Sequence, residues 1–145
     1  MKPANRTAHP TTNPEVFDTS FPARADEVGN ARRAFADWLC RRIEGDVVTE
    51  MEIVFSELAA NAVDASPRES DQVRGRAWCD GPDLVLDLTN QTDTTPGKAR
   101  RWDLDDPLRT GGRGLVITEA FVDSVEIALE SDDQRLVVRC RRRID

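Results

Sequence analysis

Histidine and cysteine, the usual protein ligands for zinc, are scarce in this sequence of 145 residues. The only histidine is His9, near the N-terminus, and the three cysteines, Cys40, Cys79 and Cys140, lie far apart with no Cys-x-x-Cys spacing. A zinc site therefore lacks ligands, and three isolated cysteines do not make a disulfide framework. We interpret the cysteines as small apolar residues of a protein from a reducing compartment.

Long apolar runs and an excess of basic residues are missing as well. No run approaches the roughly 18 residues of a membrane span, and no apolar signal-peptide core follows Met1. We therefore expect a cytoplasmic protein with no membrane contact. Lys and Arg number 20 against 27 Asp and Glu, a formal net charge of −7. Direct binding to nucleic acid is not expected of such a chain, whereas a small anion held by backbone amides is compatible with it.

The chain has the length of one domain with a buried core. Residues 1–14 contain three prolines and no apolar periodicity, which predicts a disordered tail. Residues 15–145 are expected to form the domain itself. Within it, apolar residues recur at helical spacing over residues 25–43, and again from Asp46, interpreted as an N-cap, to about Ala65.

The pattern then changes to alternation, which is typical of strands. The segments QVRGRAWCDG and DLVLDLTN predict a hairpin, and SVEIALE and RLVVRCR predict two more strands. Residues 91–113 are predicted to form a long polar loop, which in a compact domain is usually either functional or a sign of a wrong assignment. A short helix is predicted at residues 115–122 and a first strand at residues 16–23, which Pro22 ends. This order describes an α+β sandwich with helices on one face of a mostly antiparallel sheet.

A polar stripe runs along the second predicted helix, within the segment FSELAANAVDAS. Glu57, Asn61 and Asp64 are spaced i, i+4 and i+7, which places them on one side of a helix. A solvated helix face is the ordinary reading of such a stripe. However, the alanines around it allow a ligand to approach the backbone, and a carboxylate and an amide oxygen one turn apart suit Mg²⁺. Both interpretations stay open at this point.

A second stretch, RTGGRGLVITEAFVD, places Gly111, Gly112 and Gly114 just before the short predicted helix. Glycines before a helix N-terminus expose backbone amides, and the helix dipole favours an anion there. An ordinary flexible loop is the alternative. No Gly-Lys-Ser/Thr follows and no strand leads directly into the glycines, so the stretch is neither a Walker motif nor a dinucleotide fingerprint.

Together, the two stretches resemble a known family. SELAANAVDAS looks like the N-box of the histidine-kinase-like (GHKL) ATPases, and GGRGLVITEAFVD looks like their second glycine box. FPARADEVGNARRAFADWL is similar to the opening of one branch, the bacterial anti-sigma-factor serine/threonine kinases. The resemblance covers the chain from about residue 16 to its end. It implies a Bergerat-type fold, a two-layer sandwich of helices on a mixed sheet, with ATP and Mg²⁺ as cofactors.

The resemblance also implies a role for each matching residue. Asn61 would hold Mg²⁺ on the triphosphate, and Glu57 would act as general base or orient the attacking hydroxyl. Residues 94–110 would form a mobile lid. Asn90 would contact adenine. The other predicted cofactor-binding residues, which would cradle the phosphates, are Gly111, Gly112, Arg113 and Gly114.

The first glycine box departs from the family pattern. An Asp normally follows the strand and accepts a hydrogen bond from the adenine amino group, and a Gly comes shortly after it; Asn90 and Thr92 stand in these places here. An Asn carbonyl accepts the same bond without charge assistance, a loss of about 1 kcal/mol. Thr92 has a Cβ that could crowd the base, and Asp64 replaces a His often found in the N-box. Asp87 is a weaker candidate for the adenine contact, because strand alternation points it away from Leu88.

Three functions are compatible with the sequence. The first is an ATP-dependent serine/threonine protein kinase that acts as an anti-sigma factor, phosphorylating an anti-anti-sigma (STAS-type) protein and sequestering a sigma factor. The second is a catalytically weak or inactive partner-switching module, which the altered first box favours. The third is an acidic interaction domain without nucleotide. The resemblance suggests a homodimer, and the basic run Arg139–Arg143 predicts a contact for an acidic partner or a solvated strand end.

Overall fold

The computed structural model describes residues 15–92, 118–130 and 134–144. Within these ranges five strands form one sheet in the order β1-β2-β3-β5-β4, and every neighbouring pair is antiparallel. The elements are β1 (Val16–Pro22), the 3-10 turn η3 (Ala25–Glu27), α1 (Val28–Cys40), α2 (Asp46–Ala65), β2 (Gln72–Asp80), β3 (Asp83–Gln91), β4 (Ser124–Glu130) and β5 (Arg135–Arg143). The predicted α+β architecture is confirmed.

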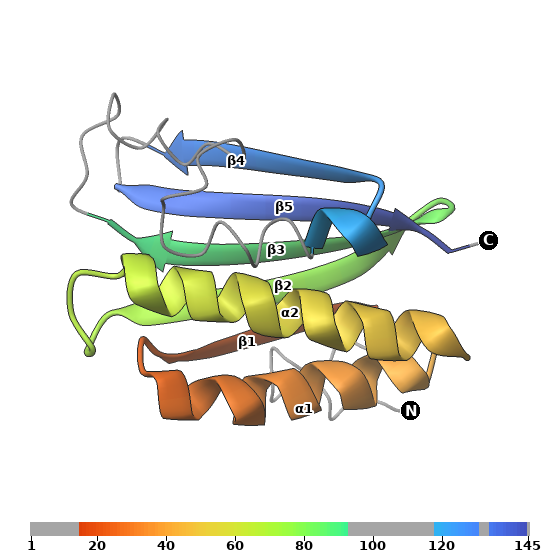
Figure 1. The fold of residues 1–145 in the computed structure, drawn as a ribbon, viewed down its shortest axis with the longest axis horizontal. Coiled ribbons are helices and arrows are strands. Elements are labelled where there is room, and N and C mark those ends of the chain that lie inside the picture. Colours follow the sequence, from red (N-terminus) through yellow and green to blue (C-terminus); the bar gives the residue numbers. More distant parts are fainter. Residues whose placement is uncertain (1–14, 93–117, 131–133, 145) are drawn as a thin grey trace, which may run out of the picture.

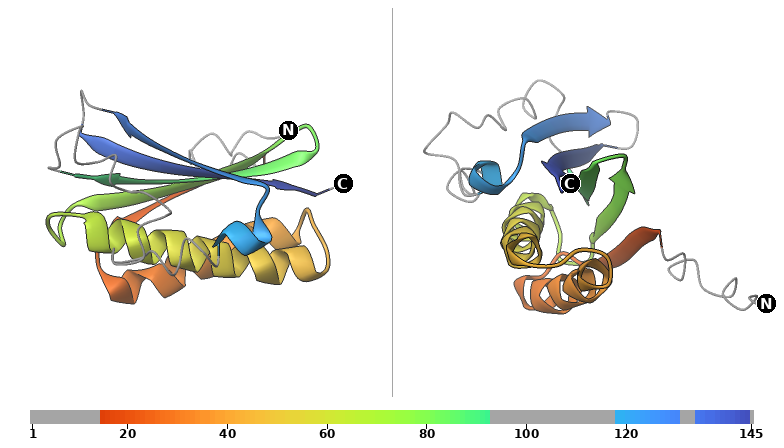
Figure 2. Two further views of the ribbon diagram at one scale, coloured as in Figure 1. Left: turned by 45° about the horizontal axis from the view of Figure 1, so that its top comes forward. Right: turned by 90° about the vertical axis from the view of Figure 1, so that its right-hand side faces the viewer.

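The helices and the sheet form two layers. Figure 1 shows α1 and α2 side by side, and Figure 2 shows both on the same face of the sheet. The alternation in each strand decides which residues meet the helices: in β3, Leu84, Leu86 and Leu88 belong to the core, whereas Asp87 lies on the open face. No described helix covers that second face.

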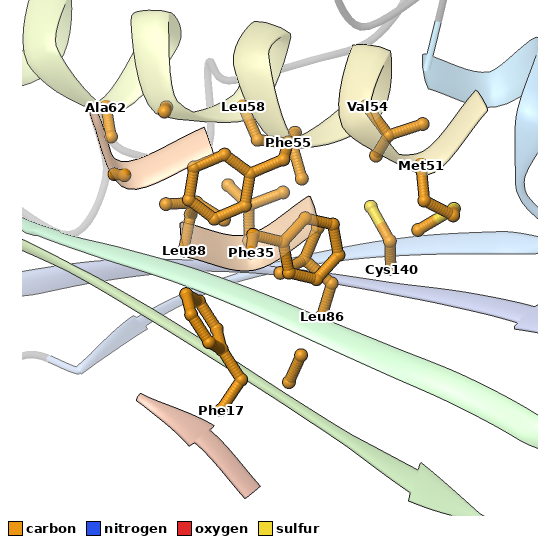
Figure 3. Packing of buried hydrophobic residues seen from close by; sticks show 14 of the residues in the cluster. Phe17, Phe35, Met51, Val54, Phe55, Leu58, Ala62, Leu86, Leu88 and Cys140 are labelled. Atoms are coloured by element: carbon orange, nitrogen blue, oxygen red, sulfur yellow. The ribbon is translucent and has the colours of Figure 1, made fainter. Parts of the chain in front are cut away.

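Three phenylalanines form the centre of the core, with Phe35 stacked on Phe55 and Phe17 edge-on to both, and a glycine lies beneath Phe55. The ring of Phe35 lies 4.9 Å from that of Phe55 and 5.5 Å from that of Phe17, measured between centroids. Figure 3 shows the rings of Phe35 and Phe55 between α2 and the sheet, with Phe17 beside β1. Gly75 of β2 lies under the Phe55 ring, where an added Cβ would come within 3.2 Å of Phe55 Cε2. A side chain at position 75 would therefore push the two layers apart.

The helix boundaries differ from the sequence expectation in two places. The region predicted as one helix begins with η3 and ends at Cys40, because the N–H groups of both Arg42 and Ile43 bond the Leu39 carbonyl and close the turn. The N-cap of α2 is Gly45, with φ 85° and ψ −155°, and not Asp46, which is the first helical residue. The predicted end of α2 at Ala65 is confirmed.

A short helical turn, residues 118–121, precedes β4 and lies beside the N-terminal half of α2 (Figures 1 and 2). Phe121 packs against the core cluster, and Thr118 is fully buried. The rest of the predicted helix from Leu115 lies outside the described residues. None of the described helices is long and apolar enough to cross a membrane.

Candidate nucleotide-binding site

The polar stripe of α2 divides into three different environments. Val54, Leu58 and Ala62 face the sheet, and Asn61 lies at the edge of this apolar row, where only 5% of it is exposed. Glu57 is half-buried, one turn before Asn61. Asp64 is exposed and lines a separate groove of about 760 Å³ at the C-terminal end of α2. The structure therefore keeps Glu57 and Asn61 together, and Asp64 belongs to a different groove.

Asn90 lies on the same side of the sheet as the core leucines of β3, and it is buried, with 2% of its surface exposed. The C-terminal ends of β3 and α2 lie at the same end of the molecule (Figure 1), and Figure 3 shows Ala62 and Leu88 at the same end of the core cluster. Asn90 therefore belongs to the same end of the helix–sheet interface as Asn61. The Asn90 Nδ2 donates to the Gln91 carbonyl at 2.7 Å, which leaves Oδ1 as the atom suited to accept from an amino group.

Thr92, in the position of the expected glycine, is buried at the end of β3. Its backbone N–H donates to the Gln134 carbonyl at 2.8 Å, which ties this end of β3 to the start of β5. Its side chain is therefore part of the packed interior beside Asn90. That the Thr92 Cβ restricts the space for an adenine base stays a prediction.

Asp87 is confirmed as pointing away from the helices. It lies on the open face of the sheet, where it accepts two hydrogen bonds from Arg139, at 2.7 Å from Nε and 2.8 Å from Nη2. The hydrogen bond to Asp87 raises the pKa of Arg139, although burial opposes the shift. Because Asp87 is paired with Arg139 and faces away from the helices, it is not placed to contact an adenine bound between α2 and β3.

Glu57 also lines an open groove on the outer side of the helices, with a volume of about 280 Å³. Its other lining residues are Arg32 of α1 and Thr49, Glu52, Ile53 and Ser56 of α2. Ile53 is 38% exposed and is the exposed large hydrophobic residue of the described chain. The Nε of Arg32 is buried and has no hydrogen-bond partner among the described residues. The groove thus combines an apolar surface, an incompletely bonded cation and the candidate base.

Sequence reasoning missed one contact close to these residues. Nη1 of Arg142, on β5, lies 2.8 Å from Glu50 Oε1 of α2 and donates to the Phe121 carbonyl at 2.8 Å. The alternation Leu136, Val138, Cys140 places Arg142 on the helix-facing side of β5, and this signal was available in the sequence. Its partners were not, because Glu50 is far away along the chain.

Several predicted site residues lie outside the described part of the chain. They are the glycine-box residues Gly111, Gly112, Arg113 and Gly114 and the predicted lid, residues 94–110. The described residues contain no group of three His, Cys, Asp or Glu side chains that could hold a metal ion. By the predicted role of Asn61, a magnesium ion in this site would be held by its amide oxygen and by the oxygens of a bound phosphate, which is the usual way Mg²⁺ is held beside a nucleotide.

A family model, the histidine kinase-like ATPase domain, matches residues 21–142. The chain belongs to this family. Similar solved structures include the mycobacterial sensor histidine kinase MprB, with a TM-score of 0.57 and 15% identity over 86% of this chain and 97% of that chain. The nucleotide-free catalytic domain of the histidine kinase ThkA has a TM-score of 0.56 and 15% identity, covering 88% and 97%. No curated protein matches the chain.

Membership of the histidine kinase-like ATPases supports ATP as the ligand, usually bound with Mg²⁺ in this family. The described residues fit such a ligand at two positions. Asn61 carries a buried side-chain amide at the α2 edge, and Asn90 offers Oδ1 at the end of β3. At 15% identity the two histidine kinase structures establish the shared fold and nothing about substrate.

Proposed function

We propose that this domain is an ATP-dependent serine/threonine protein kinase that acts as an anti-sigma factor. It would phosphorylate an anti-anti-sigma protein of the STAS type, and capture or release a sigma factor accordingly. The observation that carries the proposal is the position of Glu57, which is one turn from Asn61 and also lines a groove open to a partner protein. A base in that position can serve a hydroxyl delivered by another protein.

The groove has the chemistry to receive a protein segment beside Glu57. Ile53 offers an apolar contact one turn away, and burial of an exposed aliphatic side chain favours association. Arg32 offers a guanidinium whose Nε lacks a described partner, which favours a carboxylate on the incoming segment. A segment held at these two points would present its Ser or Thr hydroxyl to the carboxylate of Glu57.

The residues divide the work of phosphoryl transfer between them. Asn61 would hold the magnesium ion, and Asn90 would accept a hydrogen bond from the adenine amino group through Oδ1. Bound Mg-ATP supplies the phosphoryl group that is transferred. Glu57 would orient the Ser or Thr hydroxyl and take its proton as the oxygen forms its bond to phosphorus and ADP departs.

A second candidate, a partner-switching module with little or no catalysis, is favoured by one observation. Thr92 is buried beside Asn90, in the two positions where the family pattern has a glycine and an aspartate. Weaker contact with the adenine of ATP would lower the affinity for nucleotide and leave the partner-binding groove intact. The two candidates differ in phosphoryl transfer, not in partner binding.

Thermal unfolding with and without Mg-ATP tests the nucleotide site. A ligand at a hundredfold excess over its dissociation constant stabilises the folded state by about 2.7 kcal/mol, so the midpoint of wild type should rise. Asn61→Ala should abolish this rise, because the amide that would hold Mg²⁺ is gone. The same variant without nucleotide serves as its own control for stability. An unchanged wild-type midpoint at saturating Mg-ATP would refute the kinase.

Transfer of radiolabelled phosphate to a purified anti-anti-sigma protein separates the two candidates. Glu57→Gln should slow transfer by about 100-fold, the usual contribution of a general base, while leaving the Mg-ATP midpoint shift unchanged. Glu52→Gln is the matched control, because it removes the same charge from the same groove. Equal transfer rates in the two variants would refute the role given to Glu57. A nucleotide-dependent shift without any transfer by wild type would leave the partner-switching module.

A further inference from the structure

The open face of the sheet contains a cavity of about 380 Å³ beside the C-terminal end of β3. Six charged residues line it: Arg74, Arg76, Arg135, Arg139, Asp87 and Glu130. Four arginines against two carboxylates leave this lining with a formal charge of +2, in a chain whose net charge is −7. The cavity is therefore a local concentration of positive charge on an acidic protein, and such a site attracts anions.

The strand register explains why these arginines meet. Arg76 of β2 lies opposite Asp87 of β3, and Asp87 lies opposite Arg139 of β5, so the three form one row across the open face. Arg74 lies two residues earlier on β2, on the same face and opposite Thr89. Guanidinium groups from β2 and β5 therefore surround the cavity, with β3 between them.

Neighbouring carboxylates hold two of these guanidinium groups along one edge only. Arg74 donates from Nε and Nη2 to Asp18, at 3.0 and 2.6 Å, and Arg139 donates from the same two atoms to Asp87. Among the described residues, Nη1 of Arg74 and Nη1 of Arg139 donate to no acceptor. The Nε of Arg76 is buried, has no hydrogen-bond partner within the described ranges and lies 3.9 Å from Asp18 Oδ2. The side chains are thus fixed in place with donors still available, which lowers the entropy cost of binding a ligand.

We propose that this cavity is a binding site for a phosphate monoester, held by Arg74, Arg76 and Arg139. The planar donor groups of arginine match the oxygens of a phosphate. A phosphate monoester carries a charge of about −1.5 to −2 at pH 7, which balances the +2 of the lining, whereas a single carboxylate would balance only half of it. The cavity lies on the face of the sheet away from α1 and α2 (Figure 2), so this site is separate from the candidate nucleotide site.

NMR titration of the isotope-labelled protein with O-phosphoserine at constant ionic strength tests the site. The Nε–H signals of Arg74, Arg76 and Arg139 should shift and saturate, and serine should shift none of them. Arg76→Gln should raise the dissociation constant about tenfold, the value of one charge-assisted hydrogen bond. This variant should keep the stability of wild type, because the Arg76 side chain is 42% exposed and its Nε loses no hydrogen bond to a described residue.

Two control variants locate the effect. Arg141→Gln removes the same charge from the open face of β5 outside the cavity, where the side chain pairs with Asp80 and Asp83, and it should bind O-phosphoserine like wild type. Asn61→Ala changes the candidate nucleotide site on the other face and should also bind like wild type, so the result is independent of whether Mg-ATP binds. Equal dissociation constants for wild type and Arg76→Gln, or the absence of a saturable shift, would overturn the proposal.

Three further ligands define the class of molecule that is bound. A phosphoserine-containing peptide that binds more tightly than O-phosphoserine would support the proposal and assign the phosphate to a modified partner protein. A sugar phosphate that binds more tightly would support it and assign the phosphate to a small metabolite. Inorganic sulfate that binds as tightly as O-phosphoserine would show a general anion site and would overturn the assignment to a phosphate monoester.

Discussion

Arginine and aspartate side chains neutralise one another on the open face of the sheet. Arg74 pairs with Asp18 at 2.6 Å, and Arg139 pairs with Asp87 at 2.7 Å. The basic run Arg139–Arg143 had two interpretations from sequence, a contact for an acidic partner or a solvated strand end. In the structure three of its members form ion pairs within the molecule: Arg139 with Asp87, Arg141 with Asp80 and Asp83, and Arg142 with Glu50 of α2.

The pair of Asp87 and Arg139 should contribute measurably to stability. Asp87 is nearly buried and accepts two hydrogen bonds, so Asp87→Ala leaves the guanidinium without them. We expect a loss of about 2 kcal/mol in the free energy of unfolding, at the low end for a partly buried pair because the Arg139 side chain is 38% exposed. Asp83→Ala, on the same face, should cost about 0.5 kcal/mol. Equal losses in urea unfolding would contradict the role of Asp87.

At the scale of elements, two glycines should respond to alanine in opposite directions. Gly45, before α2, has φ 85° and ψ −155°, a conformation that only glycine adopts readily, so Gly45→Ala should cost about 2 kcal/mol. Gly29 lies inside α1, and an added Cβ would meet only Arg33 Nη1 at an ordinary 3.6 Å. Gly29→Ala should therefore stabilise the protein by about 0.5 kcal/mol. Thermal or urea unfolding of both variants measures the sign, and a stabilised Gly45→Ala would be the contrary result.

Elements with clear periodicity were predictable from sequence, and their junctions were not. The hairpin of β2 and β3 and the extent of α2 follow from spacing alone, because each has an apolar face that packs in the core. The N-cap of α2 was misassigned because Asp46 is a good capping residue, and only the backbone shows that Gly45 makes the turn. Arg142 was missed because an ion pair with Glu50 joins positions 92 residues apart, and no local pattern records it.

At the scale of the molecule, some features of the candidate site follow from residue spacing in the sequence, and others are visible only in the fold. The stripe of Glu57 and Asn61 was visible as a helical pattern, and Asn90 was identified from the resemblance to the first glycine box of the family. Their assembly at one end of the two layers required the antiparallel order of the sheet. The groove beside Glu57 forms because α1 packs against α2, so that Arg32 of α1 and Ile53 of α2 line the same groove. The site therefore depends on the same layer contacts that stabilise the fold.

The buried thiol of Cys140 links the stability of the whole molecule to pH. It lies in the core close to Met51 (Figure 3), and burial, with a smaller contribution from Asp87, raises its pKa from 9.0 to about 12. Between these values the thiol ionises in the unfolded chain and stays protonated in the folded one. The unfolded state then binds fewer protons, so the contribution of this thiol to the free energy of unfolding should be constant well below pH 9 and fall as the pH rises towards 12.

Urea unfolding of wild type and Cys140→Ala from pH 8 to pH 11 tests this linkage. Cys140→Ala should be less stable at pH 8, because the smaller side chain leaves a cavity, and its stability should then decline less steeply with pH. The other groups that titrate in this range are common to both proteins, so the difference between the slopes isolates the buried thiol. A thiol reagent at pH 8 should label the exposed Cys40 and Cys79 quickly and Cys140 only on unfolding. Parallel slopes, or rapid labelling of all three cysteines in the folded protein, would show that the core around Cys140 admits water, and the packing of β5 against α2 would then need revision.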